Sequence, residues 1–251
     1  MNDTPRRSAL VPPLERGHYV VACIAVPMLL AAPAVSIWRG NWEFLYYSAW
    51  LMVFAAGVLV LDARVRLPFV VYWGLTLWCL AHLAGGIVPI PESLTEPGRP
   101  PNLYNMRVAP WMPKYDQVVH CLGFLVATLC AWCGLRSRIV GAVVESGASP
   151  SDTPAARRAT TRVGFGLFLA VVLMGMGLGA MNEVIEFVAT QIMPWTNVGG
   201  YENTGWDLVS NLVGCLIAAC LAATHPSWLE PRGLGSRGVA SREVTPASSA
   251  P

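Results

Sequence analysis

Residues 163–190 read VGFGLFLAVVLMGMGLGAMNEVIEFVAT, a stretch with no charged side chain before Glu183 and Glu186. An α-helix needs about 20 mainly apolar residues to cross the hydrocarbon core of a bilayer, so this stretch predicts a transmembrane helix. Its two acids are three residues apart and therefore share one helix face. Gly175 and Gly179 are four apart, which predicts a face where another helix packs closely.

Five more stretches have the same apolar character. The six predicted spans cover residues 18–38, 42–61, 67–90, 116–135, 163–190 and 206–224. The composition of the whole chain also indicates a membrane protein, because 54% of its 251 residues are apolar and only 13% are charged. This share of charged residues is about half the share that is usual in soluble proteins. The sequence therefore predicts an all-α integral membrane protein with about six transmembrane helices, and it excludes a soluble globular domain.

The Lys and Arg residues are distributed unevenly around these spans. Of the 17, all but Arg39, Arg99, Arg107 and Lys114 lie in segments 1–17, 62–66, 136–162 and 225–251. Cytoplasmic loops of membrane proteins carry an excess of Lys and Arg. We therefore expect both termini in the cytoplasm, with an N-terminal segment 1–17, a transmembrane domain 18–224, a flexible loop at about 136–162 and a flexible tail 225–251. Loops 91–115 and 191–205 should lie outside.

The net charge of the chain argues against a nucleic-acid partner. The formal net charge is only +2, and there is no basic stripe with interleaved aromatic residues, so a nucleic-acid partner is not expected. Membrane lipids are the expected partners.

Polar residues gather near the predicted outer ends of four spans. His82 lies about 12 Å inside the third span, at 1.5 Å per helical residue. Asp116 and His120 are four apart, as are Asp207 and Asn211, so each pair shares a helix face. The candidate functional residues are His82, Asp116, His120, Glu183, Glu186, Asp207 and Asn211.

Such a layer needs an explanation, because a carboxylate at mid-helix costs on the order of 3 kcal/mol to insert. Taken singly, these residues have structural explanations: an interhelical hydrogen bond, or an N-cap for Asp116 and Asp207. Taken together, they predict groups that pair with one another, bind a cation or line water.

Three kinds of chemistry fit this layer. Imidazole and carboxylate groups on facing helices hold divalent metals in helical bundles, and the metal-ligand candidates are His82, Asp116, His120, Glu186 and Asp207. Without a metal, a His beside an Asp acts as a general base and a Glu as an acid. A proton or ion relay is the third option. The Glu-x-x-His spacing of dinuclear carboxylate sites is absent, and the sequence alone does not rank the three.

Four motifs in order resemble a known family. They are His82 with Gly85-Gly86, Tyr115-Asp116-x-x-x-His120, Asn182-Glu183-x-x-Glu186 and Trp206-Asp207-x-x-x-Asn211-x-x-Gly214. Over about residues 70–220 the chain resembles the YjdF-like inner-membrane proteins and, more distantly, VanZ-like membrane proteins. The resemblance implies a multi-pass protein of the bacterial inner membrane, but no particular activity. The chain departs from the YjdF-like pattern at Asn203, where that pattern has an Asp.

The sequence thus leaves three functional hypotheses. The first is an intramembrane enzyme that acts on a lipid or lipid-linked substrate at the outer side, assisted by a divalent metal or by acid–base groups. In this enzyme hypothesis, the cations available to contact an anionic headgroup are Arg99, Arg107 and Lys114. The second is an ion- or proton-coupled transporter or binding protein, and the third is a membrane scaffold whose polar layer only locks the helices. Whether the protein is an enzyme is left open at this point.

Overall fold

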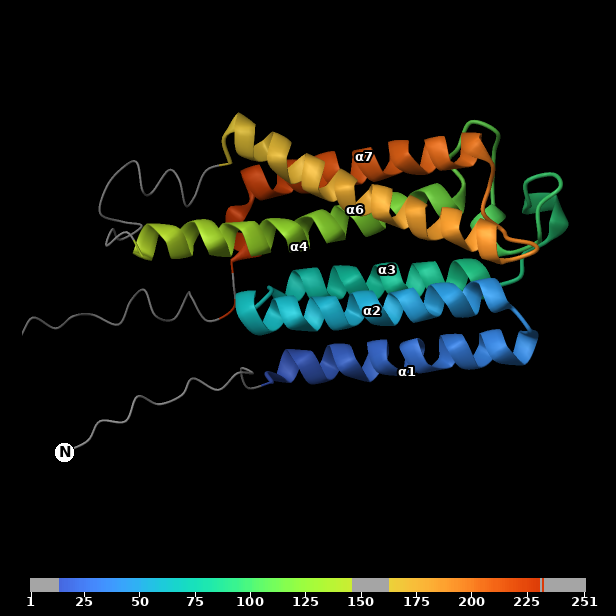
Figure 1. Ribbon diagram of the computed structural model, residues 1–251, viewed down its shortest axis with the longest axis horizontal. Helices are drawn as coiled ribbons and strands as arrows, with labels where there is room; N and C mark the ends of the chain where they lie inside the picture. Colours follow the sequence, from blue (N-terminus) through green and yellow to red (C-terminus); the bar gives the residue numbers. More distant parts are fainter. Residues whose placement is uncertain (1–13, 146–162, 231, 233–251) are drawn as a thin grey trace, which may run out of the picture.

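The computed structural model describes residues 14–145, 163–230 and 232, and this part of the chain is built from helices. Six of them are long and apolar enough to cross a membrane, which confirms the predicted all-α membrane architecture. They are α1 (Arg16–Arg39), α2 (Trp42–Val65), α3 (Phe69–Ile87), α4 (Tyr115–Glu145), α6 (Phe165–Ile192) and α7 (Tyr201–Thr224). The helices run along the long axis of the molecule, and α6 crosses α4 and α7 obliquely (Figure 1).

Two helix boundaries differ from the sequence-based expectation by more than four residues, whereas the others differ by at most four. Helix α7 begins at Tyr201 rather than at residue 206; residues 201–205 contain no proline, and Glu202 lies in the first turn, where the helix dipole favours negative charge. Helix α4 continues to Glu145, so the first part of the predicted cytoplasmic loop 136–162 is helical. The rest of that loop, segment 1–13 and most of the predicted tail lie outside the described residues.

Helix α4 is the central element of the bundle. In its most apolar 18-residue window 50% of the residues are buried, compared with 17% in α1 and in α2. Helices α6 and α7 pack on one side of α4, and α3 packs on the other with α1 and α2 beyond it (Figure 1). The closest approach is to α7, because a Cβ added at Gly214 would lie 2.2 Å from the carbonyl oxygen of Cys121 in α4.

The predicted glycine face of α6 is confirmed. A Cβ at Gly175 would lie 2.1 Å from Thr128 Oγ1 of α4, and one at Gly179 would lie 3.0 Å from Asn211 Nδ2 of α7. A Cβ at Gly177, which points elsewhere, would meet nothing within 4 Å. These small residues bring α6 close enough for its acids to meet side chains of α4 and α7.

The two ends of the bundle differ in composition. At the end where α2 stops and α3 starts, the interior is filled mainly by apolar side chains, among them Leu67, Val71, Leu129, Trp132 and Val171. We call the other end the loop end; it carries segments 88–114 and 193–200. There the short turns η1 (Glu92–Leu94) and η2 (Leu103–Asn105) and the isolated bridges Pro89–Asn102 and Thr95–Met106 give the longer segment a fixed shape.

Candidate functional site

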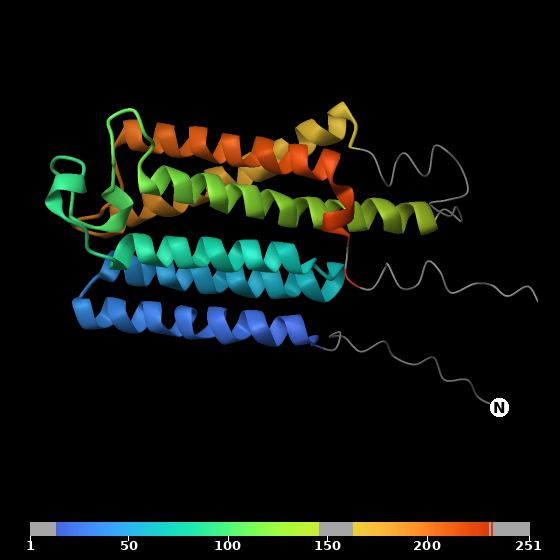
Figure 2. The same cartoon turned by 180° about the vertical axis from the view of Figure 1, so that it is seen from behind.

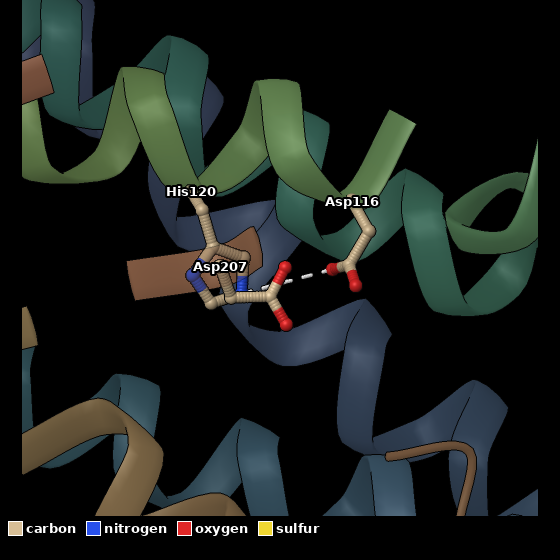
Figure 3. A group of neighbouring side chains, drawn as sticks. All are labelled: Asp116, His120 and Asp207. Atoms are coloured by element: carbon tan, nitrogen blue, oxygen red, sulfur yellow. Dashed lines mark ion pairs between the residues drawn. The ribbon is translucent and has the colours of Figure 1, made fainter. Parts of the chain in front are cut away.

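Helix α4 positions Asp116 and His120 at the loop end. The helix begins at Tyr115, and the backbone N–H of the preceding Lys114 donates a hydrogen bond to Gln117 Oε1 at 2.9 Å. Asp116 and His120 are one turn apart and share a face, as predicted. His120 Nε2 lies 3.7 Å from Asp116 Oδ1 (Figure 3).

His120 is the centre of a buried cluster that α6 and α7 complete. Its Nε2 lies 3.7 Å from Glu186 Oε1, and its Nδ1 lies 3.6 Å from Glu183 Oε1. Nδ1 also lies 3.1 Å from Asn211 Oδ1 of α7. The imidazole is only 7% exposed, so it meets these groups away from bulk water.

Asp207 brings a fourth carboxylate to the same imidazole. The residue is fully buried at 0% exposure, and Figure 3 shows its carboxyl group beside the His120 ring. Its Oδ2 accepts a hydrogen bond from Asn203 Nδ2 at 2.5 Å. Its Oδ1 and the Oε2 of Glu183 are buried and have no hydrogen-bond partner in the part of the chain that the structure describes. A buried polar atom without a partner is costly, so both oxygens are available to a further ligand.

The donor atoms are spaced as a metal requires. Asp116, His120 and Asp207 each offer one ligand atom within 4.8 Å of the others, and so do His120, Glu183 and Glu186. Two ligands on opposite sides of an ion, at about 2.1 Å each, are about 4.2 Å apart, so the side chains need only small movements to close on an ion. One imidazole nitrogen with several carboxylate oxygens is a donor set that suits ions such as Zn²⁺ or Mn²⁺. The residues therefore fit a divalent metal.

The charges of the cluster do not balance by themselves. Four carboxyl groups surround one imidazole, and the nearest further cation, Lys114, has its Nζ 3.8 Å from Asp116 Oδ2 and 3.6 Å from Glu96 Oε2. Like charges at such distances disfavour one another strongly in a desolvated site. The cluster therefore needs bound protons or a bound cation, which are the two states that acid–base chemistry and metal chemistry use.

His82 lies to one side of this cluster. It is in neither group of metal-compatible residues among those described. Its Nδ1 is 2.7 Å from the hydroxyl of Tyr104, which also donates to the His82 carbonyl oxygen at 2.8 Å. Since one hydroxyl has one proton to donate, this arrangement favours a proton on Nδ1 and a free lone pair on Nε2. The metal-ligand role predicted for His82 stays a prediction, and it would have to use Nε2.

Tyr104 closes the site from the loop segment. Burial, with the charges of Asp116 and Glu186, raises the pKa of Tyr104 well above its ordinary value, so the phenol stays neutral. Gly85 makes room for its ring, because a Cβ there would lie 2.4 Å from Tyr104 Cε1. A cavity of about 60 Å³ lies between Tyr104, His82, Asp116 and Glu186, enough for water.

Sequence reasoning missed one residue that builds this site, Glu43, and assigned no role in the cluster to two others, Lys114 and Asn203. Glu43 of α2 is buried, and both of its carboxylate oxygens lie 2.9 Å from the backbone nitrogen of Asn197, which holds segment 193–200. Lys114 donates a hydrogen bond to Asn203, which in turn donates to Asp207. Glu43 had a usable signal, an acid at the outer end of a span. Sequence reasoning assigns Lys114 only to a headgroup contact and notes Asn203 only as a departure from the YjdF-like pattern, because residues 201–205 are predicted as a loop.

Among the comparisons with known proteins, the chain matches one family model. A family model described as "Predicted membrane protein (DUF2238)" matches residues 17–227. The matched range includes all four motifs behind the resemblance to YjdF-like proteins, although the match itself carries neither that name nor the VanZ-like one. No curated protein and no solved structure matches the chain.

Proposed function

The chain belongs to the DUF2238 family of predicted membrane proteins, and from that premise we propose that it is an intramembrane enzyme acting on a lipid or lipid-linked substrate. The observation that carries the proposal is the surrounding of one buried imidazole, His120, by four carboxyl groups from three spanning helices. Perturbed, partly unsatisfied ionisable groups gather at reactive sites more often than elsewhere. Within a membrane they mark function by default.

The side chains take different roles in this proposal. His120, Asp116, Glu186 and Asp207 are the candidate metal ligands or proton-transfer groups, and the Nε2 of His82 is a further one. Glu183 and Asn211 contact His120 Nδ1 and orient the ring, as the hydrogen-bonded partners of ligating histidines do in known metal sites. A divalent metal, when bound, supplies Lewis-acid activation of a substrate oxygen.

The depth of the site indicates the class of substrate. The cluster occupies the first turns of α4 and α7 and the last turns of α6. In a bilayer that these helices span, we expect it just inside the membrane boundary. A lipid headgroup or its linkage lies at this depth. Placement in the bacterial inner membrane, with both termini in the cytoplasm, belongs to the same proposal and rests on the arginine distribution and the YjdF-like resemblance.

The two other functions have less support. A transporter needs a polar route to the opposite end, whereas the interior on the way is lined mainly by apolar side chains such as Val71, Leu129 and Trp132. At that end, the largely buried Asp62, His18 and Arg232 are paired with one another. A scaffold needs only mutual hydrogen bonds, whereas Glu183 Oε2 and Asp207 Oδ1 have no such partner among the described residues.

The test is conversion of lipids in proteoliposomes. The purified protein is reconstituted in liposomes made from total bacterial lipid extract with Zn²⁺ or Mn²⁺, and the lipids are compared by mass spectrometry before and after incubation. The variants are Glu186→Gln, which keeps the shape of the side chain, and Glu92→Gln, a matched control at an exposed acid.

We expect a lipid species to change with the wild type and with Glu92→Gln, and not with Glu186→Gln. Ion flux without any lipid change would instead support the transporter. If neither occurs and Glu186→Gln only lowers the melting temperature, the scaffold is correct and the proposal is wrong.

A further inference from the structure

A groove runs along the surface between α4 and α7, next to the buried cluster and separate from it. It has a volume of about 1200 Å³, and none of its lining residues belongs to α6. Figure 2 shows α4 and α7 side by side, with α6 behind them. The groove is shaped by segment 96–113 at the loop end and by the two helices below it.

The part of the groove farther from the loop end, here called its lower part, is apolar and as long as one leaflet. It is lined by Val118, Leu122 and Leu125 of α4 and by Val209 and Val213 of α7. Leu125 is about 15 Å along the axis from the start of α4, at 1.5 Å per residue. The hydrocarbon core of a bilayer is about 30 Å thick, so the groove follows the outer leaflet alone, the length of one acyl chain.

The upper part of the groove, at the loop end, carries three cations. Arg99, Arg107 and Lys114 line it together with the acids Glu96 and Glu202. Glu96 serves two of the cations, with one oxygen 3.5 Å from Arg107 Nη2 and the other 3.6 Å from Lys114 Nζ. Lys114 also has its Nζ 3.8 Å from Asp116 Oδ2 of the cluster, so the cation without an ion pair among the described residues is Arg99.

Two of these cations have unused hydrogen-bonding capacity. Among the residues described, the guanidinium of Arg99 makes no ion pair and no side-chain hydrogen bond, and the buried Nε of Arg107 has no partner either. An arginine fork suits the oxygens of a phosphate group. At the mouth, Trp111 is 84% exposed and Trp206 is 53% exposed, and such aromatic residues favour the headgroup level of a membrane.

One residue joins the groove to the buried cluster. Asn203 lines both the large groove and the small cavity beside Asp116 and Glu186. It accepts a hydrogen bond from Lys114 on the groove side and donates one to Asp207 on the cluster side. A headgroup seated at Lys114 is therefore one side chain away from the cluster.

We infer that this groove binds one anionic phospholipid from the outer leaflet, with its phosphate at Arg99, Arg107 and Lys114 and an acyl chain along α4 and α7. The inference rests on the proposed function in so far as it names the substrate class as a phosphate-bearing lipid. Lipid binding itself follows from the cations, the length and the apolar lining of the groove, so it can be tested apart from any reaction.

The experiment is native mass spectrometry of the purified full-length chain titrated with dioleoyl phosphatidylglycerol or dioleoyl phosphatidylcholine. The test variants are the double Arg99→Gln, Arg107→Gln change at the upper part and Val213→Trp, which fills the lower part. The matched controls are the double Arg64→Gln, Arg138→Gln change, at two exposed arginines elsewhere, and Val184→Trp, at an exposed position of α6.

We expect the wild type and both controls to bind the first phosphatidylglycerol about tenfold more tightly than phosphatidylcholine, since each cation beside an anionic lipid adds attraction. The arginine variant should lose this preference, its Arg99→Lys, Arg107→Lys counterpart should keep most of it, and Val213→Trp should lose binding of both lipids. Equal affinity for the two lipids in the wild type, or an unchanged preference in the glutamine variant, would overturn the inference.

Two further readings separate the possible failures. Displacement of phosphatidylglycerol by millimolar inorganic phosphate would show a phosphate site rather than a lipid seat, and would also overturn the inference. Metal content is measured in the same samples. Lipid binding without bound metal or lipid conversion would contradict the proposed enzyme and support lipid binding in the groove. Bound metal and lipid conversion without selective lipid binding would support the enzyme and contradict the groove.

Discussion

Asn211 of α7 lies with its Oδ1 3.1 Å from Nδ1 of His120 of α4. An amide oxygen only accepts hydrogen bonds, so this contact keeps a proton on Nδ1. It leaves Nε2, the nitrogen that faces Asp116 Oδ1 and Glu186 Oε1 at 3.7 Å each, free to take a proton or a metal. Asn211 thereby sets the chemical state of the ring without facing the reactive side itself.

Replacement of Asn211 by Ala should therefore weaken metal binding without removing any ligand. Loss of a partner that orients a ligating His typically costs 10- to 100-fold in metal affinity, and we expect a drop on the order of tenfold in the affinity for Zn²⁺, measured by competition with a fluorescent chelator. Ser210→Ala is the control, because Ser210 bonds only the Trp206 carbonyl of its own helix. Equal Zn²⁺ affinity in the two variants would show that Asn211 does not orient the ring.

The contact between α4 and α7 should depend on Gly214. A Cβ at this position would lie 2.2 Å from a backbone oxygen, which does not move as the end of a side chain does, so Gly214→Ala should lower the free energy of unfolding by about 1–3 kcal/mol. Gly205→Ala in the same helix meets nothing within 4 Å and should be neutral or slightly stabilising. Unfolding in mild detergent, followed by circular dichroism, compares them. A Gly214→Ala protein as stable as Gly205→Ala would contradict the described packing.

Much of this architecture is predictable from sequence, because the bilayer imposes a simple length and polarity rule on each span. The pairs Asp116/His120 and Glu183/Glu186 are also visible, since helical periodicity alone places each pair on one face. Periodicity does not tell which helices meet. It therefore missed that Glu43 holds a loop and that His82 faces Tyr104 instead of the imidazole of His120.

The start of α7 is the clearest case of missing information. The residues from Tyr201 to Gly205 are polar enough to read as loop, but the helix extends through them and places Asn203 one turn before Asp207. Local composition favoured a loop, and packing of the loop end decided otherwise. The small cavity and the lateral groove are likewise tertiary features that no single span reveals.

Tyr104 makes stability fall at high pH. Its pKa is raised by burial, so above about pH 10 the unfolded chain loses a proton from this phenol that the folded chain keeps, and the contribution of Tyr104 declines as pH rises. The slope contributed by this phenol approaches about 1.4 kcal/mol per pH unit as the unfolded chain's tyrosine becomes fully ionised. In Tyr104→Phe the free energy of unfolding should therefore fall less steeply between pH 10 and 11 than in the wild type. Tyr201→Phe, at a 96% exposed position, is the control and should retain the wild-type slope; identical slopes in all three proteins would argue against a buried, neutral Tyr104.

Metal content after purification shows whether the carboxylates around His120 form the proposed divalent-metal site. The protein is equilibrated with Zn²⁺ or Mn²⁺ in detergent, freed of unbound metal and measured by inductively coupled plasma mass spectrometry. Beside it are His120→Ala and the control His225→Ala, which changes an exposed His outside the cluster. We predict about one metal ion per chain in the wild type and in His225→Ala, and less than about a tenth of that in His120→Ala, as loss of a central ligand implies. A wild type that retains no metal, or a His120→Ala protein that retains as much as the wild type, would contradict the proposed metal site.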